Sequence, residues 1–144
     1  MTDRTTLTGG CLCGAVRYRA EASATLPYVC WCADCRRWGG GPAHWAVVVA
    51  SREVAIEGAP RVHVVTAESG REVARYFCGA CGGHLFTSPW PEVSRYSLKA
   101  GTLDDPTLYE AQHEIWARSR APWADRNPEA DRHEAGFPGP VPIG

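Results

Sequence analysis

The chain has 144 residues, a length that suits one domain of ordinary size and is short for a two-domain enzyme. Hydrophobic residues make up 44% and charged residues 22%, which excludes disorder, collagen-like repetition and extreme low complexity. The formal charge of −1 excludes the basic excess on which nucleic-acid binding depends, so we expect no nucleic-acid partner. The unusual number is the cysteine count, because there are seven cysteines and a single methionine.

Segments with strand-like patterning follow one another along most of the chain. Apolar and polar residues alternate over residues 15–20, directly after a first cysteine pair, which indicates a half-buried strand. Six further strands are expected between turns that contain glycine or proline: 43–50, 54–57, 62–66, 72–77, 84–87 and 93–98. A second cysteine pair lies in the hairpin-like connection at residues 77–83. This spacing predicts a mainly β fold.

Two segments depart from the strand pattern. Residues 28–38 carry three cysteines and run into glycines at 39–41, so we expect a short helical turn that ends in glycine. Residues 109–116 are expected to form a last strand or an irregular arm. The tail that follows has five of the eleven prolines and no apolar periodicity. We therefore predict a domain over residues 1–120 and a proline-rich tail over residues 121–144, draped on the surface or mobile.

The N-terminal residues and the cysteines indicate the compartment. Residues 1–6 show no apolar stretch behind a basic start, and an odd number of cysteines argues against a secreted disulfide framework. The longest apolar run, residues 45–50, has the length of a strand rather than the roughly 18 residues of a membrane helix. We expect a cytoplasmic protein with no membrane segment, in which closely spaced thiols bind metal.

Four of the cysteines form two close pairs, Cys11 with Cys13 and Cys78 with Cys81. Each pair is followed by a glycine, Gly14 or Gly82, which permits a positive φ and lets backbone amides approach the thiolates. Joining pairs 65 positions apart costs about 3.7 kcal/mol of closure entropy, whereas zinc on four thiolates contributes about 10 kcal/mol or more. We predict a closed structural zinc site; the alternative is four buried thiols without metal.

The remaining three cysteines, Cys30, Cys32 and Cys35, lie within six residues, so one turn can present all three sulfurs to one ion. Three protein ligands leave one zinc position open, which is the property that separates catalytic zinc sites from structural ones. We predict that these cysteines hold a second, catalytic zinc suited to thiol chemistry. The alternative is a structural site closed by a fourth ligand, taken from His44, His63, His84 and Asp34.

Four motifs carry a resemblance to a known family: Gly10-Cys-Leu-Cys-Gly-Ala-Val-Arg-Tyr18, Cys30-x-Cys-x-x-Cys-Arg-Arg37, Phe77-Cys-x-x-Cys-Gly-Gly83 and Lys99-Ala-Gly-Thr-Leu-Asp104. Over nearly all of residues 8–118 the chain resembles the glutathione-dependent formaldehyde-activating enzyme family, which includes centromere protein V-like proteins. The resemblance implies a β-tent fold of antiparallel sheets held by zinc, with few helical turns. It implies a carbon–sulfur lyase that joins formaldehyde reversibly to glutathione, so the expected partners are a small thiol and an aldehyde.

Carried over residue by residue, the resemblance assigns two zinc ions to the seven cysteines. The structural zinc would be held by Cys11, Cys13, Cys78 and Cys81, and the catalytic zinc by Cys30, Cys32 and Cys35. The spacing of the cysteines divides them in the same way. An alternative of another class is a non-catalytic, zinc-stabilised binding module of the β-tent type.

Other residues are candidates for binding substrate and moving protons. Arg36 and Arg37 follow the triplet and could hold a substrate carboxylate; the alternative is a solvated surface pair. The candidates for proton transfer are His44, His113 and Glu114. The candidates for the pocket wall, most of which we expect to pack in the core instead, are Trp38, Trp45, Trp90 and Trp116.

Overall fold

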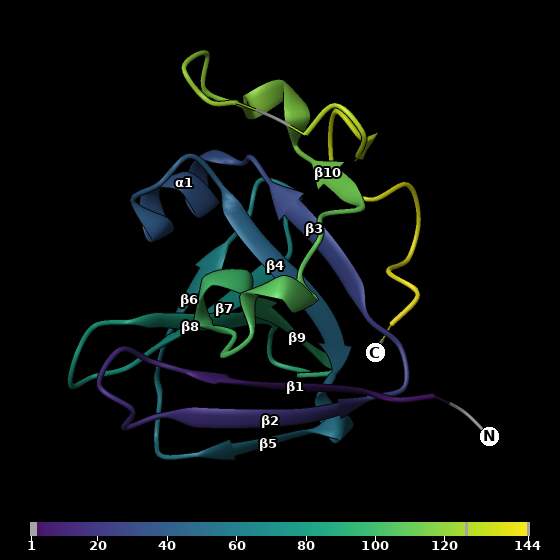
Figure 1. Ribbon diagram of the computed structural model, residues 1–144. Coiled ribbons are helices and arrows are strands. Elements are labelled where there is room, and N and C mark those ends of the chain that lie inside the picture. The colour runs from purple at the N-terminus through teal and green to yellow at the C-terminus, as the bar shows by residue number, and fades with distance from the viewer. Residues whose placement is uncertain (1–2, 126, 144) are drawn as a thin grey trace.

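The computed structural model describes residues 3–125 and 127–143. The helix α1 spans Ala33–Gly39, and the strands are β1 Thr5–Gly10, β2 Arg17–Ala22, β3 Leu26–Cys30, β4 His44–Ala50, β5 Val54–Glu57, β6 Arg61–Thr66, β7 Glu72–Phe77, β8 His84–Pro89, β9 Arg95–Lys99, β10 His113–Ile115 and β11 Asp131–Arg132. They form a three-stranded sheet in the order β1-β2-β5 and an eight-stranded sheet in the order β11-β10-β3-β4-β9-β8-β7-β6. Figure 1 shows the small sheet at one end of the molecule, with α1 and β10 at the other.

The mainly β fold of antiparallel sheets is confirmed. The expected strands from β4 to β9 form, and so does the expected helical turn, which ends at Gly40 with a φ of 71°. Three strands were missed, and one of them, β11, is only two residues long and lies in the tail, where no strand was expected. The segment Thr5–Gly10 is mostly polar and glycine, and Leu26–Cys30 contains a proline, so neither shows a regular alternation.

Glycine is required in β1 because neighbouring atoms approach its backbone closely. A Cβ added to Gly9 would lie 2.3 Å from both the carbonyl oxygen of Thr102 and the hydroxyl oxygen of Tyr18. The Tyr18 hydroxyl and the Thr102 hydroxyl form a hydrogen bond of 2.7 Å at this point. Gly9, which weakens the strand pattern in the sequence, therefore lets the small sheet approach the turn after β9.

Strand β4 is buried on both faces, which explains its continuous apolar run. Val47 and Val49 belong to the core cluster shared with residues of β1 and β2, such as Leu7 and Tyr18. Ala46, Val48 and Ala50 point to the other face and pack in a second cluster. This second cluster also contains Tyr28, Cys30 and Cys35, so β4 separates the main core from the cysteine triplet.

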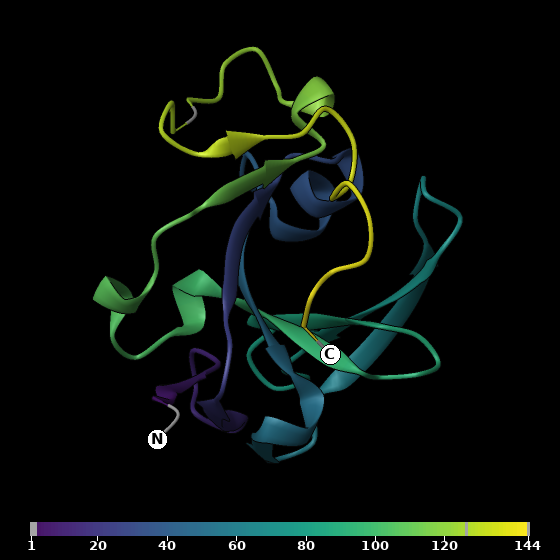
Figure 2. The same ribbon diagram turned by 90° about the vertical axis from the view of Figure 1, so that its right-hand side faces the viewer.

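The C-terminal part of the chain adds parallel pairings to the large sheet. Strand β10 pairs in parallel with β3 and with β11 (Figure 2). Further along the tail, Phe137, Val141 and Ile143 pack against the cluster around Cys30 and Cys35. The division into a domain over 1–120 and a tail over 121–144 stays a prediction, and residues 1, 2, 126 and 144 of those ranges lie outside the described residues.

Within the part of the chain that the structure describes, no helix has both the length and the apolar character needed to cross a bilayer.

Candidate metal centres and pocket

Four thiols from two distant turns meet at one point, where the β1–β2 turn approaches the β7–β8 turn. The sulfurs of Cys11, Cys13, Cys78 and Cys81 all lie within 4.8 Å of one another. We call this group the four-thiol cluster. The Cys13 Sγ lies 3.7 Å from the Cys11 Sγ and 3.8 Å from the Cys78 Sγ, which joins the two turns.

The two turns of the four-thiol cluster aim backbone amides at sulfur. Gly14 and Gly82 adopt positive φ angles of 79° and 75°. The N–H of Val16 donates to the Cys11 Sγ at 3.3 Å, and the N–H groups of Ala80 and Gly83 donate to Cys78 and Cys81 at 3.4 Å. Amide donors of this kind stabilise thiolates, and four thiolates are the ligand set of a closed zinc site. The residues fit zinc.

A second group of thiols lies at the junction of β3 and α1. The sulfurs of Cys30, Cys32 and Cys35 lie within 4.8 Å of one another, and we call them the three-thiol cluster. Cys30 ends β3, Cys32 caps the N-terminus of α1, and Cys35 lies in its first turn. The N–H of Cys35 donates to the Cys32 Sγ at 3.3 Å. Among residues 3–125 and 127–143, no His, Asp or Glu joins this group at the same distance, so the three thiols could hold a metal with one position left open.

The proposed fourth ligands lie around this group without completing it. His44 lies opposite Cys30 on β4 and is buried, and Asp34 lines the pocket beside the cysteines. His84 stacks on Trp38 with ring centroids 4.6 Å apart. His63 is an exposed residue of β6.

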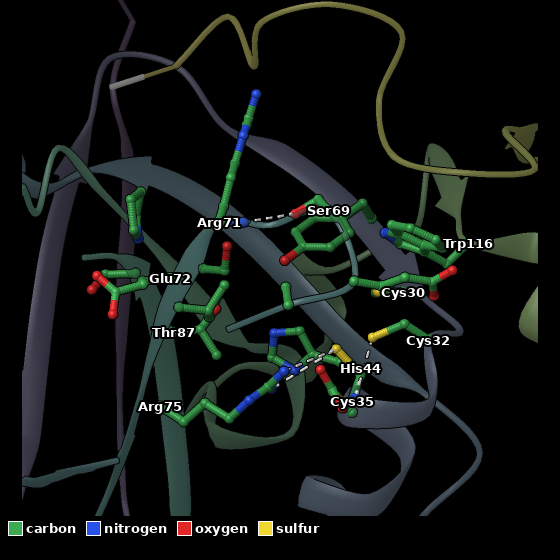
Figure 3. A pocket seen from close by; sticks show the side chains of 18 of the residues that line it. Cys30, Cys32, Cys35, His44, Ser69, Arg71, Glu72, Arg75, Thr87 and Trp116 are labelled. Atoms are coloured by element: carbon green, nitrogen blue, oxygen red, sulfur yellow. Dashed lines mark hydrogen bonds between the residues drawn. The ribbon is translucent and has the colours of Figure 1, made fainter. Parts of the chain in front are cut away.

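The three-thiol cluster lines a pocket of about 250 Å³ (Figure 3). The β6–β7 turn contributes Glu68, Ser69 and Arg71 to its wall, and the arm after β10 contributes Trp116. Ala67 of the same turn and residues from β3, α1, β4, β7, β8 and β9 supply the rest of the lining. The pocket is therefore assembled from segments that are distant in sequence around three cysteines that are close in sequence.

Cationic side chains surround the three-thiol cluster. The Arg75 guanidinium contacts the Cys35 Sγ, and the Lys99 ammonium lies 3.2 Å from the His44 Nδ1. Burial, together with the charges of Lys99 and Arg75, lowers the pKa of His44 well below its usual value. Hydrogen bonds with the thiols of Cys30 and Cys35 lower the pKa of Cys32 to about 3, and the interactions with Cys32 and Cys35 raise the pKa of Cys30. One thiolate thus forms readily in the group while another thiol holds its proton.

The structure separates the other candidate residues into those at the pocket and those elsewhere. Arg36 and Arg37 lie on α1, outside the pocket lining. Glu114 is fully buried and accepts a hydrogen bond of 2.9 Å from the Trp31 Nε1, and His113 stacks on His133. Of the proposed proton-transfer residues, His44 is the one that lines the pocket.

One of the four candidate tryptophans lines the pocket, and the other three lie elsewhere. Trp116 lines the pocket. Trp38 lies outside the lining, and the guanidinium of Arg75 and the ammonium of Lys99 lie 5.2 and 4.8 Å from its ring centroid. Trp45 packs against Trp31, and Trp90 is a partly exposed surface residue.

Sequence reasoning missed the arginines that line the pocket, which are Arg71, Arg75 and Arg95. Arg75 carried a usable signal. In the alternating pattern of β7, Arg75 lies on the same side of the strand as the apolar residues Val73 and Phe77, which is unusual for a charged residue. The structure shows that it points inward, with 5% of its surface exposed. Arg71 and Arg95 carried no local signal, because their place at the pocket depends on how β7 and β9 are ordered in the sheet.

Residues 6–119 match the model of a protein family described as "Glutathione-dependent formaldehyde-activating enzyme". The chain belongs to this family. The curated Halomonas elongata protein named "Putative glutathione-dependent formaldehyde-activating enzyme" is 29% identical over 140 residues, which cover 92% of this chain and 88% of that protein. A crystal structure of a Rhodobacter sphaeroides protein shares the fold with a TM-score of 0.54 and 23% identity, over 72% of this chain and 96% of that chain. The family resemblance of the four sequence motifs is confirmed.

Proposed function

We propose that the protein is a zinc-dependent carbon–sulfur lyase that joins formaldehyde reversibly to the thiol of glutathione or of a related small thiol. The observation that carries the proposal is the three-thiol cluster, which lines a pocket and includes no fourth protein ligand among the described residues. Family membership supports the substrates. A zinc ion on Cys30, Cys32 and Cys35 would supply a Lewis acid at an open position.

The pocket offers two arginines for the carboxylates of such a thiol. Arg71 and Arg95 both line it, and the ion pairs formed within residues 3–125 and 127–143 leave both without a carboxylate partner. Burial, with the nearby charge of Arg71, lowers the pKa of Arg95. Two like charges beside one pocket are stabilised by an anionic ligand, and guanidinium groups bind carboxylates in bidentate fashion. These residues replace Arg36 and Arg37 as the proposed carboxylate partners.

His44 supplies a hydrogen-bond donor rather than a base. The Lys99 ammonium has only donors, so the His44 Nδ1, 3.2 Å away, must accept from it. The neutral imidazole then carries its proton on Nε2, which has no partner within the described residues. If Nε2 ligated zinc, the ring would carry its proton on Nδ1 and point it at the Lys99 ammonium, so the contact with Lys99 favours an open position on the three-thiol cluster.

The test compares Cys32→Ser with the parent protein. Serine keeps the N-cap of α1, because its hydroxyl can accept from the Cys35 N–H, but it removes one thiolate. We expect the variant to stay folded with one zinc per chain and to lose the interconversion rate by about 100-fold or more, measured by NMR exchange above the uncatalysed background. The matched control, Ser69→Ala, changes a pocket residue with no sulfur contact and should keep two zinc ions.

Two results would contradict the proposal. A folded Cys32→Ser protein with one zinc and the parent rate would show that the three-thiol cluster is not the reactive site. A parent protein that holds two zinc ions but gives no rate above background would favour the non-catalytic binding module instead.

A further inference from the structure

Arg75 is a buried cation in the middle of β7. Its side chain points toward the three-thiol cluster, where Nη1 and Nη2 donate to the Cys35 Sγ at 3.9 and 4.0 Å (Figure 3). The residue is 5% exposed. Because a guanidinium is always charged, this part of the pocket carries a permanent positive charge out of contact with bulk water.

The partner of this charge is a sulfur atom. Within residues 3–125 and 127–143, no carboxylate forms an ion pair with Arg75. An unpaired buried charge is strongly disfavoured, and breaking such a pair is far more costly than breaking one at the surface. The Cys35 Sγ is therefore the atom that faces this charge, and it becomes the counter-ion of Arg75 when Cys35 ligates a metal as a thiolate.

The guanidinium is held in place by an aromatic platform. Its carbon lies 5.2 Å from the centroid of the Trp38 ring, and the Lys99 ammonium and the His84 ring also contact Trp38. Trp38 lies one turn after Cys35 on α1, so the same helix carries the sulfur and the surface on which its donor rests. A lysine at position 75 would keep the charge but lose the planar guanidinium group, whose two N–H donors reach the Cys35 Sγ.

The three sulfurs of the cluster consequently differ in their surroundings. Cys32 accepts from the N–H of Cys35, which belongs to its own helix. Cys35 accepts from a side chain of another strand. Cys30 is buried and interacts with the other two thiols. The long-range donor therefore acts on one sulfur, Cys35.

We propose that Arg75 is a positioning residue that holds the Cys35 thiolate in the three-thiol cluster and thereby sets how tightly this cluster keeps a metal. The inference rests on the proposed function, in which Cys30, Cys32 and Cys35 bind zinc. Two N–H donors offset part of the repulsion among three thiolates and fix the direction of one of them. Groups that orient metal ligands in this way commonly change metal affinity about 10- to 100-fold when they are removed.

The test measures zinc content and zinc transfer to a chromogenic chelator for Arg75→Met and Arg75→Lys. We expect the pocket zinc of Arg75→Met to transfer about 10- to 100-fold faster than that of the parent, with Arg75→Lys between the two. The zinc of the four-thiol cluster should transfer at the parent rate in both and serves as an internal reference. The matched control is Arg37→Met, which removes an exposed arginine of α1 that lies outside the pocket lining and has no sulfur contact, and it should leave both rates unchanged.

A second measurement reports on the sulfur itself. With cobalt in place of zinc, the thiolate-to-cobalt charge-transfer band of the pocket site should shift in Arg75→Lys, and that of the four-thiol site should not. Parent transfer rates in either Arg75 variant, or an unchanged band in Arg75→Lys, would overturn the inference and leave Arg75 a packing partner of Trp38. A parent protein that holds one zinc would instead overturn the proposed function, so the two failures are distinguishable.

Discussion

The two thiol clusters use the same ligand atom but differ in the hydrogen-bond donors that reach the sulfurs. The four-thiol cluster lies on surface turns, where Leu12 is 90% exposed and Cys13 is exposed, and its donors are amides of the same turns. Each cluster has two buried cysteines, but in the three-thiol cluster one donor is a side chain from a distant strand. The amide donors of the four-thiol cluster thus come from its own turns, whereas the side-chain donor at the pocket depends on the packing of the large sheet.

The clusters also differ in what they connect. The four-thiol cluster joins the β1–β2 turn of the small sheet to the β7–β8 turn of the large sheet. The three-thiol cluster lies within one short segment and connects no distant turns. A metal in the first should therefore contribute mainly to folding, and a metal in the second mainly to chemistry.

The largest expected effect comes from Cys78→Ser. Zinc on four thiolates contributes about 10 kcal/mol or more to folding, and a domain has only about 5–15 kcal/mol of net stability. We expect the variant to lose cooperative thermal unfolding, measured by circular dichroism, whereas Cys32→Ser keeps it. Equal and cooperative melting of both variants would remove the distinction between the clusters.

Metal removal should separate the clusters in time. With a chelator in excess, the three-thiol cluster should lose zinc first while the circular dichroism spectrum is unchanged, because three ligands and an adjoining pocket allow the chelator to enter. Loss of the second zinc should coincide with unfolding. Zinc release is measured by atomic emission and unfolding by circular dichroism on the same samples. Release of both ions in a single phase would contradict this order.

A smaller effect is expected from Gly82→Ala. The φ of Gly82 is 75° and the space around it is open, so the cost is backbone strain of about 1–2 kcal/mol in a turn that holds Cys78 and Cys81. The matched control is Gly101→Ala, which is also in open space but at a negative φ and should stay within about 0.5 kcal/mol of the parent. Equal free energies of unfolding from urea titrations would show that the turn is not strained.

The smallest effect is expected at the pocket rim. Arg118 lies over the Trp116 ring and forms an ion pair of 3.0 Å with Glu68, so it joins the arm after β10 to the β6–β7 turn. Both side chains are largely exposed, and the pair should change zinc transfer from the pocket by less than about fivefold when Arg118→Gln removes it.

A double change tests this rim contact. Exchanging the charges in Glu68→Arg with Arg118→Glu should restore the parent transfer rate, and Arg132→Gln, which removes a surface pair with Glu134, should have no effect on it. An effect of Arg132→Gln as large as that of Arg118→Gln would assign the change to net charge rather than to the rim.

Local spacing was enough to predict much of this molecule. Cys11 is close to Cys13 in sequence, and the three cysteines of the triplet are close to one another, so the sequence alone predicts each of these groups. The glycine that ends α1 is predicted by the preference for glycine at helix C-termini. The strands from β4 to β9 followed from alternation and turns. The partner cysteines 65 positions apart followed from the ligand number of zinc.

The pocket was not predictable because the order of the strands creates it. Arg36 and Arg37 adjoin the triplet in sequence, yet they lie outside the lining, since the helix that carries Cys35 turns them elsewhere. Arg75 reaches Cys35 across 40 residues because β7 lies in the same sheet as β3. Nothing in a local window specifies such a pairing, so the substrate-facing residues required the structure.

The packing of Phe137, Val141 and Ile143 on the cluster around Cys30 and Cys35 has a consequence for synthesis of the chain. Every thiol of both clusters has been joined to the chain once residue 81 is added, which is 62 residues before Ile143. The apolar surroundings of the triplet are incomplete until residue 143 has been added. During translation the thiols of the pocket therefore lack part of their apolar cover until the last segment of the tail has been made.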